Sequence, residues 1–502
     1  SFRLQPAVIN LFQIWIPASN YWNPFGATTL PTGQANPNRL SGLTNVPAAG
    51  IPVRLDNYRF ADAGPQYVDV DNYQARLLVG LKGEKFGFDW NSALVYAEAE
   101  ASDVSNNVNT TALQKQLALA TPDAYNPFNG GCLNDQSFGD CTPSSKVAID
   151  AITMKLRRDT RTTLSMLDFK ASKPDLAKWA AGDVGVAFGA EVRRETQKDD
   201  RDPNVDGTIQ FVDSVTGVAN VSNVAAVSPN PDSGGSRTVS AAYVEFAVPL
   251  FGRDRVLPLV RGMELQVAGR YENYSDFGSV AKPKIALAWD VADGLRFRAS
   301  YSQGFRAPNL ETTTVPLISR NTSNNDYFRC EADLRAKRIT SFANCGQSLS
   351  FQRRIAGNAN LRPEESTNKS FGVVFEPKFL PENLGNVTAT IDYWDIRQRG
   401  IVGILGPEGS IALDYLARLN GSTNPNVVRA AVNADDVAFF AGTGLTPTGR
   451  ILAIDDVYVN LQPQTVRGVD LAFLWSSPKT RIGDRKSTRL NSSHANISYA
   501  VF

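Results

Sequence analysis

Residues 281–311 alternate apolar and polar side chains in the manner of β-strands. In their second half, apolar residues take turns with polar ones: Leu295, Arg296, Phe297, Arg298, Ala299, Ser300, Tyr301 and Ser302. Because successive side chains on a strand point to opposite faces, this strand has one apolar and one strongly polar face. A soluble sandwich buries the apolar face, whereas a membrane barrel turns it outward to lipid and keeps the polar face in a wet lumen.

Strand-like runs recur along the chain, and the connections between them alternate between short and long. Most runs approach the ~9–11 residues of a tilted membrane strand, while soluble strands average nearer ~5–6. Outer-membrane barrels have short turns at one end and long loops at the other. The pattern therefore favours a barrel. The runs are 73–83, 86–98, 161–170, 184–196, 238–251, 263–274, 370–376, 387–397, 450–460 and 466–475, and the long connections are 99–159, 197–237, 307–365 and 400–449. We expect these connections to lack regular structure apart from short helices at 112–120 and 411–420.

The composition argues against several classes of protein. The chain has 51 Lys+Arg against 50 Asp+Glu, so it lacks the basic excess typical of nucleic-acid binding. No long apolar stretch without charges predicts a transmembrane helix, although barrel strands escape this criterion because they alternate. The 26 Phe, 15 Tyr and 7 Trp residues suit aromatic girdles, and they suit a large soluble β protein equally well.

The four cysteines form two local pairs in polar surroundings, Cys132 with Cys141 and Cys330 with Cys345. Local pairs in loops indicate disulfides and an oxidising compartment. A metal site is the weaker alternative, because neither spacing is C-x-x-C and no histidine accompanies them.

Candidate catalytic chemistry is sparse. The single histidine, His494, lies near the C-terminus, which excludes histidine-based catalytic triads and metal sites elsewhere. Adjacent carboxylates occur at Asp455-Asp456 and Glu364-Glu365, but neighbours on a strand face opposite ways. The sequence therefore predicts no catalytic residues, no cofactor and no metal site, and a protein that is not an enzyme.

Several motifs occur in a fixed order that resembles the barrel domain of TonB-dependent outer-membrane receptors. The resemblance covers roughly residues 15–475. The motifs are NPFG at 23–26, YNPF at 125–128, GAEVRRE at 189–195, RYENYSDFGS at 270–279 followed by KPKIALAW, SQGFRAPNL at 302–310, GNANLRPEEST at 357–367 and VDLAFLW at 469–475.

The resemblance implies an all-β protein, an antiparallel transmembrane β-barrel of the 22-stranded type with long extracellular loops. It implies location in the outer membrane of a Gram-negative bacterium, with lipid as a partner. It also implies uptake of a scarce large solute, most often an iron–siderophore complex, with cobalamin and sugars as known alternatives. In such receptors TonB acts through an N-terminal plug region. We expect that region to be absent ahead of residue 15 and the barrel to be incomplete after residue 475.

The resemblance also assigns roles to individual residues. Polar residues on the lumen side are candidates for contact with a plug, although a generic wet lumen face is an equal alternative: Glu264, Arg270, Glu272, Arg296, Arg298 and Arg306. Arg306 is also a candidate for a buried or lumen-facing ion pair with a structural role, and direct contact with the solute is the alternative. Tyr327 and Phe328, beside Cys330, are candidate solute contacts.

The C-terminal segment differs from the rest. Residues 1–483 are expected to form the partial barrel, whereas residues 484–502, DRKSTRLNSSHANISYAVF, resemble translated sequencing-adapter DNA. Alternation at 495–501 leaves a genuine last strand as the alternative. Two other functions remain open: a passive porin-like channel and a secreted soluble carbohydrate-binding β protein.

Overall fold

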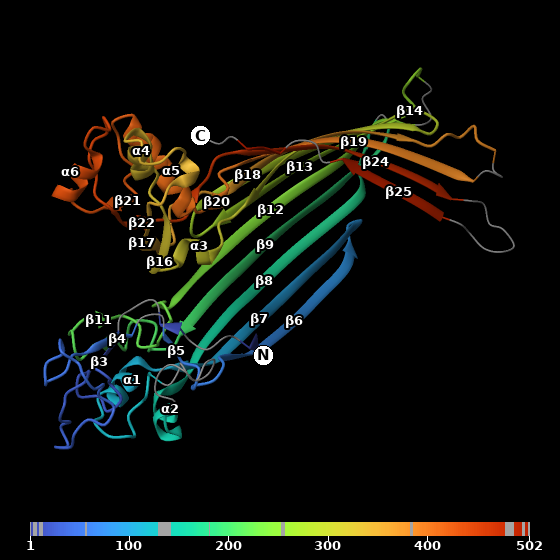
Figure 1. The fold of residues 1–502 in the computed structure, drawn as a ribbon. Coiled ribbons are helices and arrows are strands. Elements are labelled where there is room, and N and C mark those ends of the chain that lie inside the picture. The colour runs from blue at the N-terminus through green and yellow to red at the C-terminus, as the bar shows by residue number, and fades with distance from the viewer. Residues whose placement is uncertain are drawn as a thin grey trace.

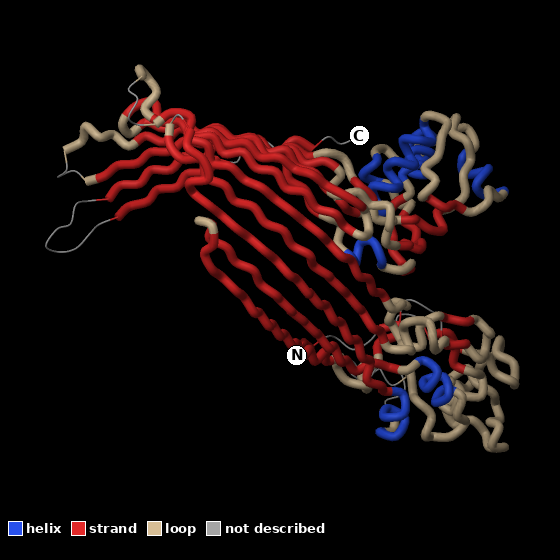
Figure 2. The backbone as a smooth tube through the Cα atoms, turned by 180° about the vertical axis from the view of Figure 1, so that it is seen from behind, coloured by secondary structure: helices blue, strands red, loops and turns tan. Residues whose placement is uncertain are grey.

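The computed structural model describes residues 14–55, 58–128, 142–179, 181–252, 257–381 and 385–476, and the backbone of 2–3, 8–9, 486–493 and 497–499. Within them, one 14-stranded antiparallel sheet forms a long curved wall that is not closed (Figures 1 and 2). This confirms the predicted antiparallel architecture. The wall strands are β6 (Tyr67–Lys85), β7 (Phe88–Val108), β8 (Thr153–Trp179), β9 (Gly182–Arg201), β12 (Ser233–Phe251), β13 (Gly262–Tyr274), β14 (Gly278–Ala292), β15 (Leu295–Arg306), β18 (Glu364–Phe375), β19 (Asn386–Arg399) and β24 (Gln464–Ser476).

Short segments flank this wall at both edges. β1 (Phe2–Arg3) pairs with β6, while β25 (Lys486–Ser493) and β26 (Ile497–Tyr499) both pair with β24. Tight turns join the strands at one end of the wall. Between β6 and β7, Phe86 and Gly87 both have positive φ, 56° and 74°, which a type I′ hairpin requires at its two central positions.

The register places apolar residues on one face of the wall and polar residues on the other. Val267 lies opposite Ile285, which lies opposite Tyr301, and this face continues to Leu81, Leu167 and Ile391, which are 68%, 56% and 54% exposed. We call this the apolar face. The opposite, polar face carries Arg270, Arg296 and their neighbours, because residues of one parity along each paired strand share a face. The same pattern across every wall strand is the signature of a barrel wall.

The first five wall strands are longer than predicted. β6, β7, β8, β9 and β12 have 19, 21, 27, 20 and 19 residues. Beyond the exposed apolar residues, the same face becomes charged, with Arg161 2.8 Å from Glu98 and Lys198 2.7 Å from Asp200. Backbone pairing between the strands therefore continues where both faces of the sheet are polar. The alternation of apolar and polar residues ends earlier than the strand itself.

The predicted strand at 450–460 is wrong as a wall strand. It forms β22 (Ile451–Asp455) and β23 (Val459–Asn460), which pair with loop strands. Ile451, Ala453 and Ile454 are buried, because they pack inside a folded loop region and not on the wall.

The long connections fold into two compact regions at the same end of the wall, which corrects the expectation of irregular loops (Figure 1). The first loop subdomain consists of the described parts of 14–66, 109–152 and 202–232, and it shares one hydrophobic core. Its elements are β3 (Ile14–Ile16), β4 (Val53–Leu55), β5 (Tyr58–Arg59), which pairs with β2 (Val8–Ile9), α1 (Thr110–Leu117), α2 (Lys146–Ile152), β10 (Phe211–Val212) and β11 (Ala219–Asn220). The core contains Ile14, Ile16, Leu55, Phe60, Val108, Leu113, Leu117, Tyr125, Ala148, Ile152, Phe211 and Ala225.

The second loop subdomain consists of residues 307–363 and 400–463. It packs helices on the small sheet β16-β17-β22-β21, whose β17 and β22 run parallel. Its other elements are α3 (Leu310–Thr314), β16 (Ile318–Asn325), α4 (Tyr327–Arg335), η2 (Phe342–Asn344), β17 (Ser348–Ile355), β20 (Val402–Gly403), α5 (Gly406–Leu419), β21 (Val427–Arg429) and α6 (Ala434–Phe440). No helix within the described ranges is long and apolar enough to cross a membrane.

Candidate functional site

An ion network occupies the polar face near the loop end of β9, β12 and β13. Arg193 contacts Glu191, Glu195 at 2.9 Å and Glu272 at 3.6 Å. Arg270 joins it through Glu272 at 2.5 Å and Glu191 at 3.2 Å. The strand register creates this network, since Glu191 lies opposite Ala241 and Ala241 lies opposite Glu272. Because the network links carboxylates to guanidinium groups, opposite charges neutralise one another, and the repulsion between like charges on this face is reduced.

Tyr274 and Arg237 extend the network toward the loops. The Tyr274 hydroxyl donates to Glu272 at 2.7 Å and accepts from Arg193 at 3.1 Å. Arg237 donates to Glu195 at 2.7 Å and lies 5.4 Å from the Tyr274 ring centre. Sequence analysis missed Arg193 and Arg237, although Arg193 stands within the GAEVRRE motif.

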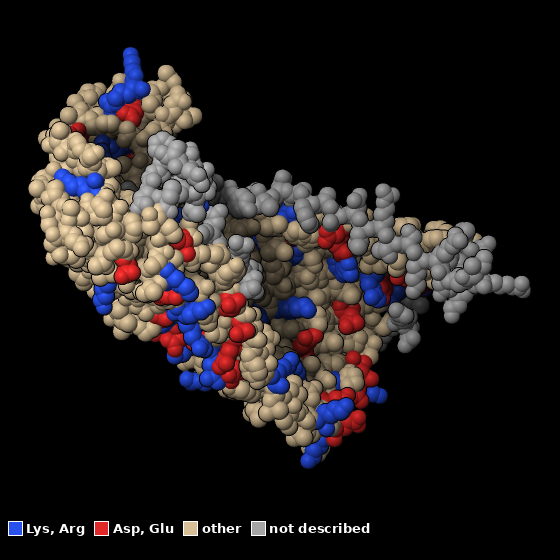
Figure 3. Space-filling model, turned by 60° about the horizontal axis from the view of Figure 1, so that its bottom comes forward, with Lys and Arg blue, Asp and Glu red and all other residues tan. Residues whose placement is uncertain are grey.

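The predicted lumen residues share the polar face but do not form one site. Arg270 and Glu272 belong to the network just described. The other four lie apart along the wall: Arg296 pairs with Asp290 at 2.6 Å, Arg298 with Asp392 at 2.5 Å, Arg306 with Glu364 at 3.8 Å, and Glu264 lies opposite Ala288. Acidic and basic side chains are correspondingly interspersed on the molecule (Figure 3).

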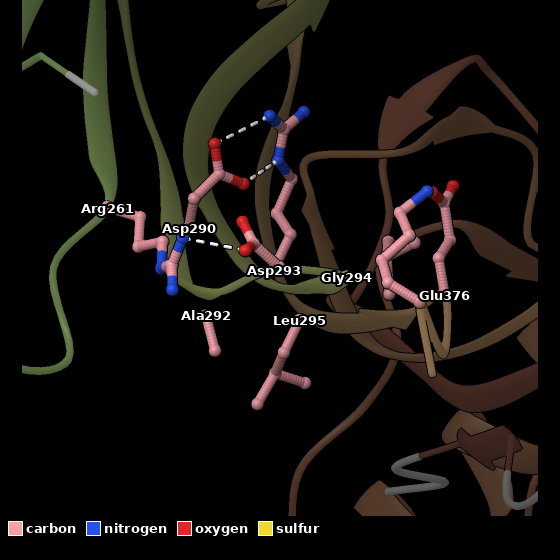
Figure 4. A pocket seen from close by; sticks show the side chains of 10 residues that line it. Arg261, Asp290, Ala292, Asp293, Gly294, Leu295 and Glu376 are labelled. Carbon is pink, nitrogen blue, oxygen red and sulfur yellow. Dashed lines mark hydrogen bonds and ion pairs between the residues drawn. The ribbon is translucent and has the colours of Figure 1, made fainter. Parts of the chain in front are cut away.

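A pocket of about 510 Å³ lies at the short-turn end, between β13, β14, β15 and β18 (Figure 4). Arg296 donates two hydrogen bonds to Asp290, of 2.6 and 2.9 Å, and Arg261 donates to Asp293 at 2.6 Å. The Glu376 amide donates to the Gly294 carbonyl at 2.6 Å. Lys378 pairs with Glu376 at 3.1 Å, so each charged group that lines the pocket has a partner within the protein.

The second loop subdomain is built around buried arginines. Arg429 donates to Asp326 at 2.5 and 2.9 Å and to Asp414 at 2.9 Å, and both carboxylates are fully buried. Burial lowers the pKa of Arg429, but the hydrogen bonds and charges of Asp326 and Asp414 outweigh it and raise this pKa above its ordinary value. The arginine therefore stays charged and ties α4, α5 and β21 together.

The candidate solute contacts occupy different environments. Phe328 is buried and packs against Phe440, with ring centres 5.6 Å apart. Tyr327 is partly exposed, and its hydroxyl donates to Glu408 at 3.1 Å. Phe328 is thus placed to stabilise the subdomain, and Tyr327 is the member of the pair that reaches the surface.

A disulfide joins Cys330 to Cys345 across 5.5 Å between Cα atoms. It ties α4 to the segment after η2. The other predicted pair, Cys132 and Cys141, lies outside the described residues, as does the side chain of every residue in the 484–502 tail.

The two NPF motifs adopt the same turn in the first loop subdomain. The side-chain oxygen of Asn23 accepts from the Phe25 amide at 2.9 Å, and that of Asn126 accepts from the Phe128 amide at 3.0 Å. Such turns replace backbone pairing where the chain reverses. Next to the second motif, burial, together with neighbouring Tyr58 and Asp62, raises the pKa of Tyr125. Tyr125 is therefore a neutral donor, and its hydroxyl bonds Asp62 at 2.6 Å.

Nothing in the described ranges gathers three or more His, Cys, Asp or Glu side chains in a way that would hold a metal ion. The described residues form ion pairs and hydrogen bonds with one another along the wall, and the loops carry aromatic and polar groups.

Comparison with known proteins gives the family. No curated protein sequence matches the chain. Among solved structures, the siderophore receptor PirA of Acinetobacter baumannii is 13% identical, with 81% of this chain and 42% of that chain covered and a TM-score of 0.43. The hemophore receptor HasR of Serratia marcescens, in complex with HasA and heme, is 12% identical, covering 86% and 49%, with a TM-score of 0.43.

The outer membrane transporter YddB of Escherichia coli is 12% identical, covering 86% of this chain and 42% of that chain, with a TM-score of 0.43. The chain thus spans less than half the length of these three proteins. A family model described as TonB dependent receptor-like, beta-barrel matches residues 17–500. Since that match covers nearly the whole sequence, the chain belongs to the TonB dependent receptor-like beta-barrel family.

Proposed function

We propose that this chain forms the wall and outer loops of an outer-membrane receptor that takes up a scarce large solute with energy supplied through TonB. An iron–siderophore complex is the first solute to test, followed by cobalamin and sugars. The observation that carries the proposal is the two-faced wall. Its exposed apolar residues suit lipid, while its polar face, lined with ion pairs, suits a wet interior.

The loop subdomains support the receptor part of the proposal. Both lie at the same end of the wall (Figure 1), and both have hydrophobic cores of their own. A passive pore requires no such folded structure at its mouth. Binding and recognition residues are commonly carried by loops that a rigid scaffold positions, and the paired strands of the wall provide that scaffold.

The test measures solute accumulation in two Gram-negative strains that carry the gene for this receptor and differ only in a working TonB system. The probes are radioactive iron bound to a catecholate, a hydroxamate or a carboxylate siderophore, with labelled cobalamin and maltodextrin alongside. We expect one probe to accumulate against its gradient in the TonB-positive strain alone.

Two controls accompany this measurement. An empty vector in both strains removes uptake by the host's own receptors, and a protonophore removes the proton gradient without removing TonB. Equal entry of the labelled probes in both strains, insensitive to the protonophore, would contradict the receptor proposal and favour a passive pore.

A further inference from the structure

After β15, the chain turns onto the polar face of the wall instead of continuing outward. Residues 307–315 follow the strand, and their helix α3 packs against β12 and β9 (Figure 1). The turn is held by Arg237 on β12, whose Nη1 donates to the Pro308 carbonyl oxygen at 2.7 Å. A side chain on the wall thus fixes the backbone of the first segment of the second loop subdomain.

Arg237 is itself held rigidly. Its Nε donates to Glu195 at 2.7 Å, its guanidinium lies 5.4 Å from the Tyr274 ring centre, and its side chain is 11% exposed. Phe305, the penultimate residue of β15, meets the same Tyr274 ring edge-on at 6.0 Å. Because the guanidinium is planar, an arginine that is bonded to a carboxylate and lies over an aromatic ring has its remaining N–H donors held in one direction.

The wall also makes room for α3. A Cβ atom at Gly235 would lie 2.9 Å from Cγ2 of Thr314 and 3.7 Å from Leu310, so a larger residue at position 235 would require the Thr314 methyl group to shift. The opposite side of the segment is bonded to the loop that follows β17. The Gly357 amide donates to the Val315 carbonyl at 2.8 Å, and the Asn358 amide donates to the Thr312 carbonyl at 3.0 Å.

We propose that Arg237 is a positioning residue that holds residues 307–315 over the inner side of the wall, where they narrow the path of the solute and couple the second loop subdomain to the barrel. The part of the proposal that concerns the path of a solute rests on the proposed uptake function. The position of the segment itself is testable without any solute.

The first test traps the segment in place. The double variant G235C/T314C puts two thiols where the closest side-chain contact lies, within reach of a disulfide. The matched control is S300C/S370C, whose parent hydroxyl oxygens are 2.7 Å apart on the neighbouring wall strands β15 and β18. In intact cells both pairs should cross-link, as shown by non-reducing peptide mapping that separates them from the native cysteines.

Cross-linking of the control without cross-linking of G235C/T314C would overturn the placement of α3. If residues 307–315 narrow the path, a large solute passes only when they move aside. For a solute that the wild type takes up, the G235C/T314C bond should therefore abolish uptake until a reductant is added, while the control bond should not. Uptake unaffected by the G235C/T314C bond would refute the narrowing of the path. Absence of uptake in the wild type would count against the proposed function alone.

The second test addresses Arg237. The probe is a membrane-impermeant polyethylene-glycol maleimide, and the measured quantity is its rate of reaction with T314C in intact cells. R237M should raise this rate about tenfold, the size expected from losing a charge-assisted hydrogen bond. R237K, which keeps a charged donor, should raise it less. R296M is the control, since Arg296 pairs with Asp290 on the same face far from α3. An equal rate in R237M and R296M would refute the role of Arg237.

Discussion

Replacing Arg429 by methionine is expected to destabilise the second loop subdomain by about 3–5 kcal/mol, the usual result of removing one partner from a buried ion pair. The methionine keeps much of the side-chain volume and removes the charge and all five donors. Asp414 keeps Arg418, which donates to it at 2.8 Å. Asp326 loses both of its Arg429 hydrogen bonds, and its carboxylate is fully buried.

This free energy corresponds to a rise of roughly a hundredfold to a few thousandfold in local opening of the subdomain. Hydrogen exchange followed by mass spectrometry measures that opening directly. The informative peptides cover α4 and α5, because Asp326 caps α4 and Asp414 lies within α5. Peptides from β13 and β14 should be unchanged, since the wall does not depend on this ion cluster.

R335M is the matched control. Arg335 pairs with Glu331 at 2.8 Å one helical turn away, but its side chain is 40% exposed. Such a pair contributes no more than about 0.5 kcal/mol after solvent screening. Our reasoning would be refuted if R429M and R335M raised exchange in α4 and α5 by the same small amount.

Three further predictions concern other parts of the molecule. F297R should impair membrane assembly by about 2–4 kcal/mol, because an arginine on the lipid-facing side near the midplane costs that much, and an impermeant thiol reagent should label a cysteine at Arg298 but not one at Phe297. Changing Cys330 and Cys345 to serine should remove up to about 3 kcal/mol of local order for a 15-residue loop, seen as faster exchange in α4. Burial raises the pKa of Asp436, but hydrogen bonds from Arg329 and the Asn433 backbone outweigh it and hold this pKa below its ordinary value. Its contribution to stability is therefore present above pH ~3.9 and lost as pH falls through the lowered pKa. D436N should show a flatter dependence of α6 exchange between pH 5 and 3 than the wild type.

The period of two along the chain was sufficient to predict the wall and its two faces. Leu295, Phe297 and Tyr301 alternate with arginines and serines, and the structure pairs them in that register with β14 and β18. Alternation reports strand structure wherever one face is apolar and the other polar. Alternation gives no signal where both faces of a strand are polar. For this reason the sequence pattern does not predict the charged ends of the longer strands.

The loop subdomains depended on contacts that no local pattern records. Ile14, Leu113 and Phe211 share one core, yet they lie in three stretches of the chain that are far apart in sequence. Likewise Arg237 and Pro308 are 71 residues apart and meet because strand pairing and the turn after β15 bring them together. The sequence shows which side chains are apolar and therefore favour burial. Which residues they pack against depends on the tertiary structure, because the paired wall strands bring distant loop segments together.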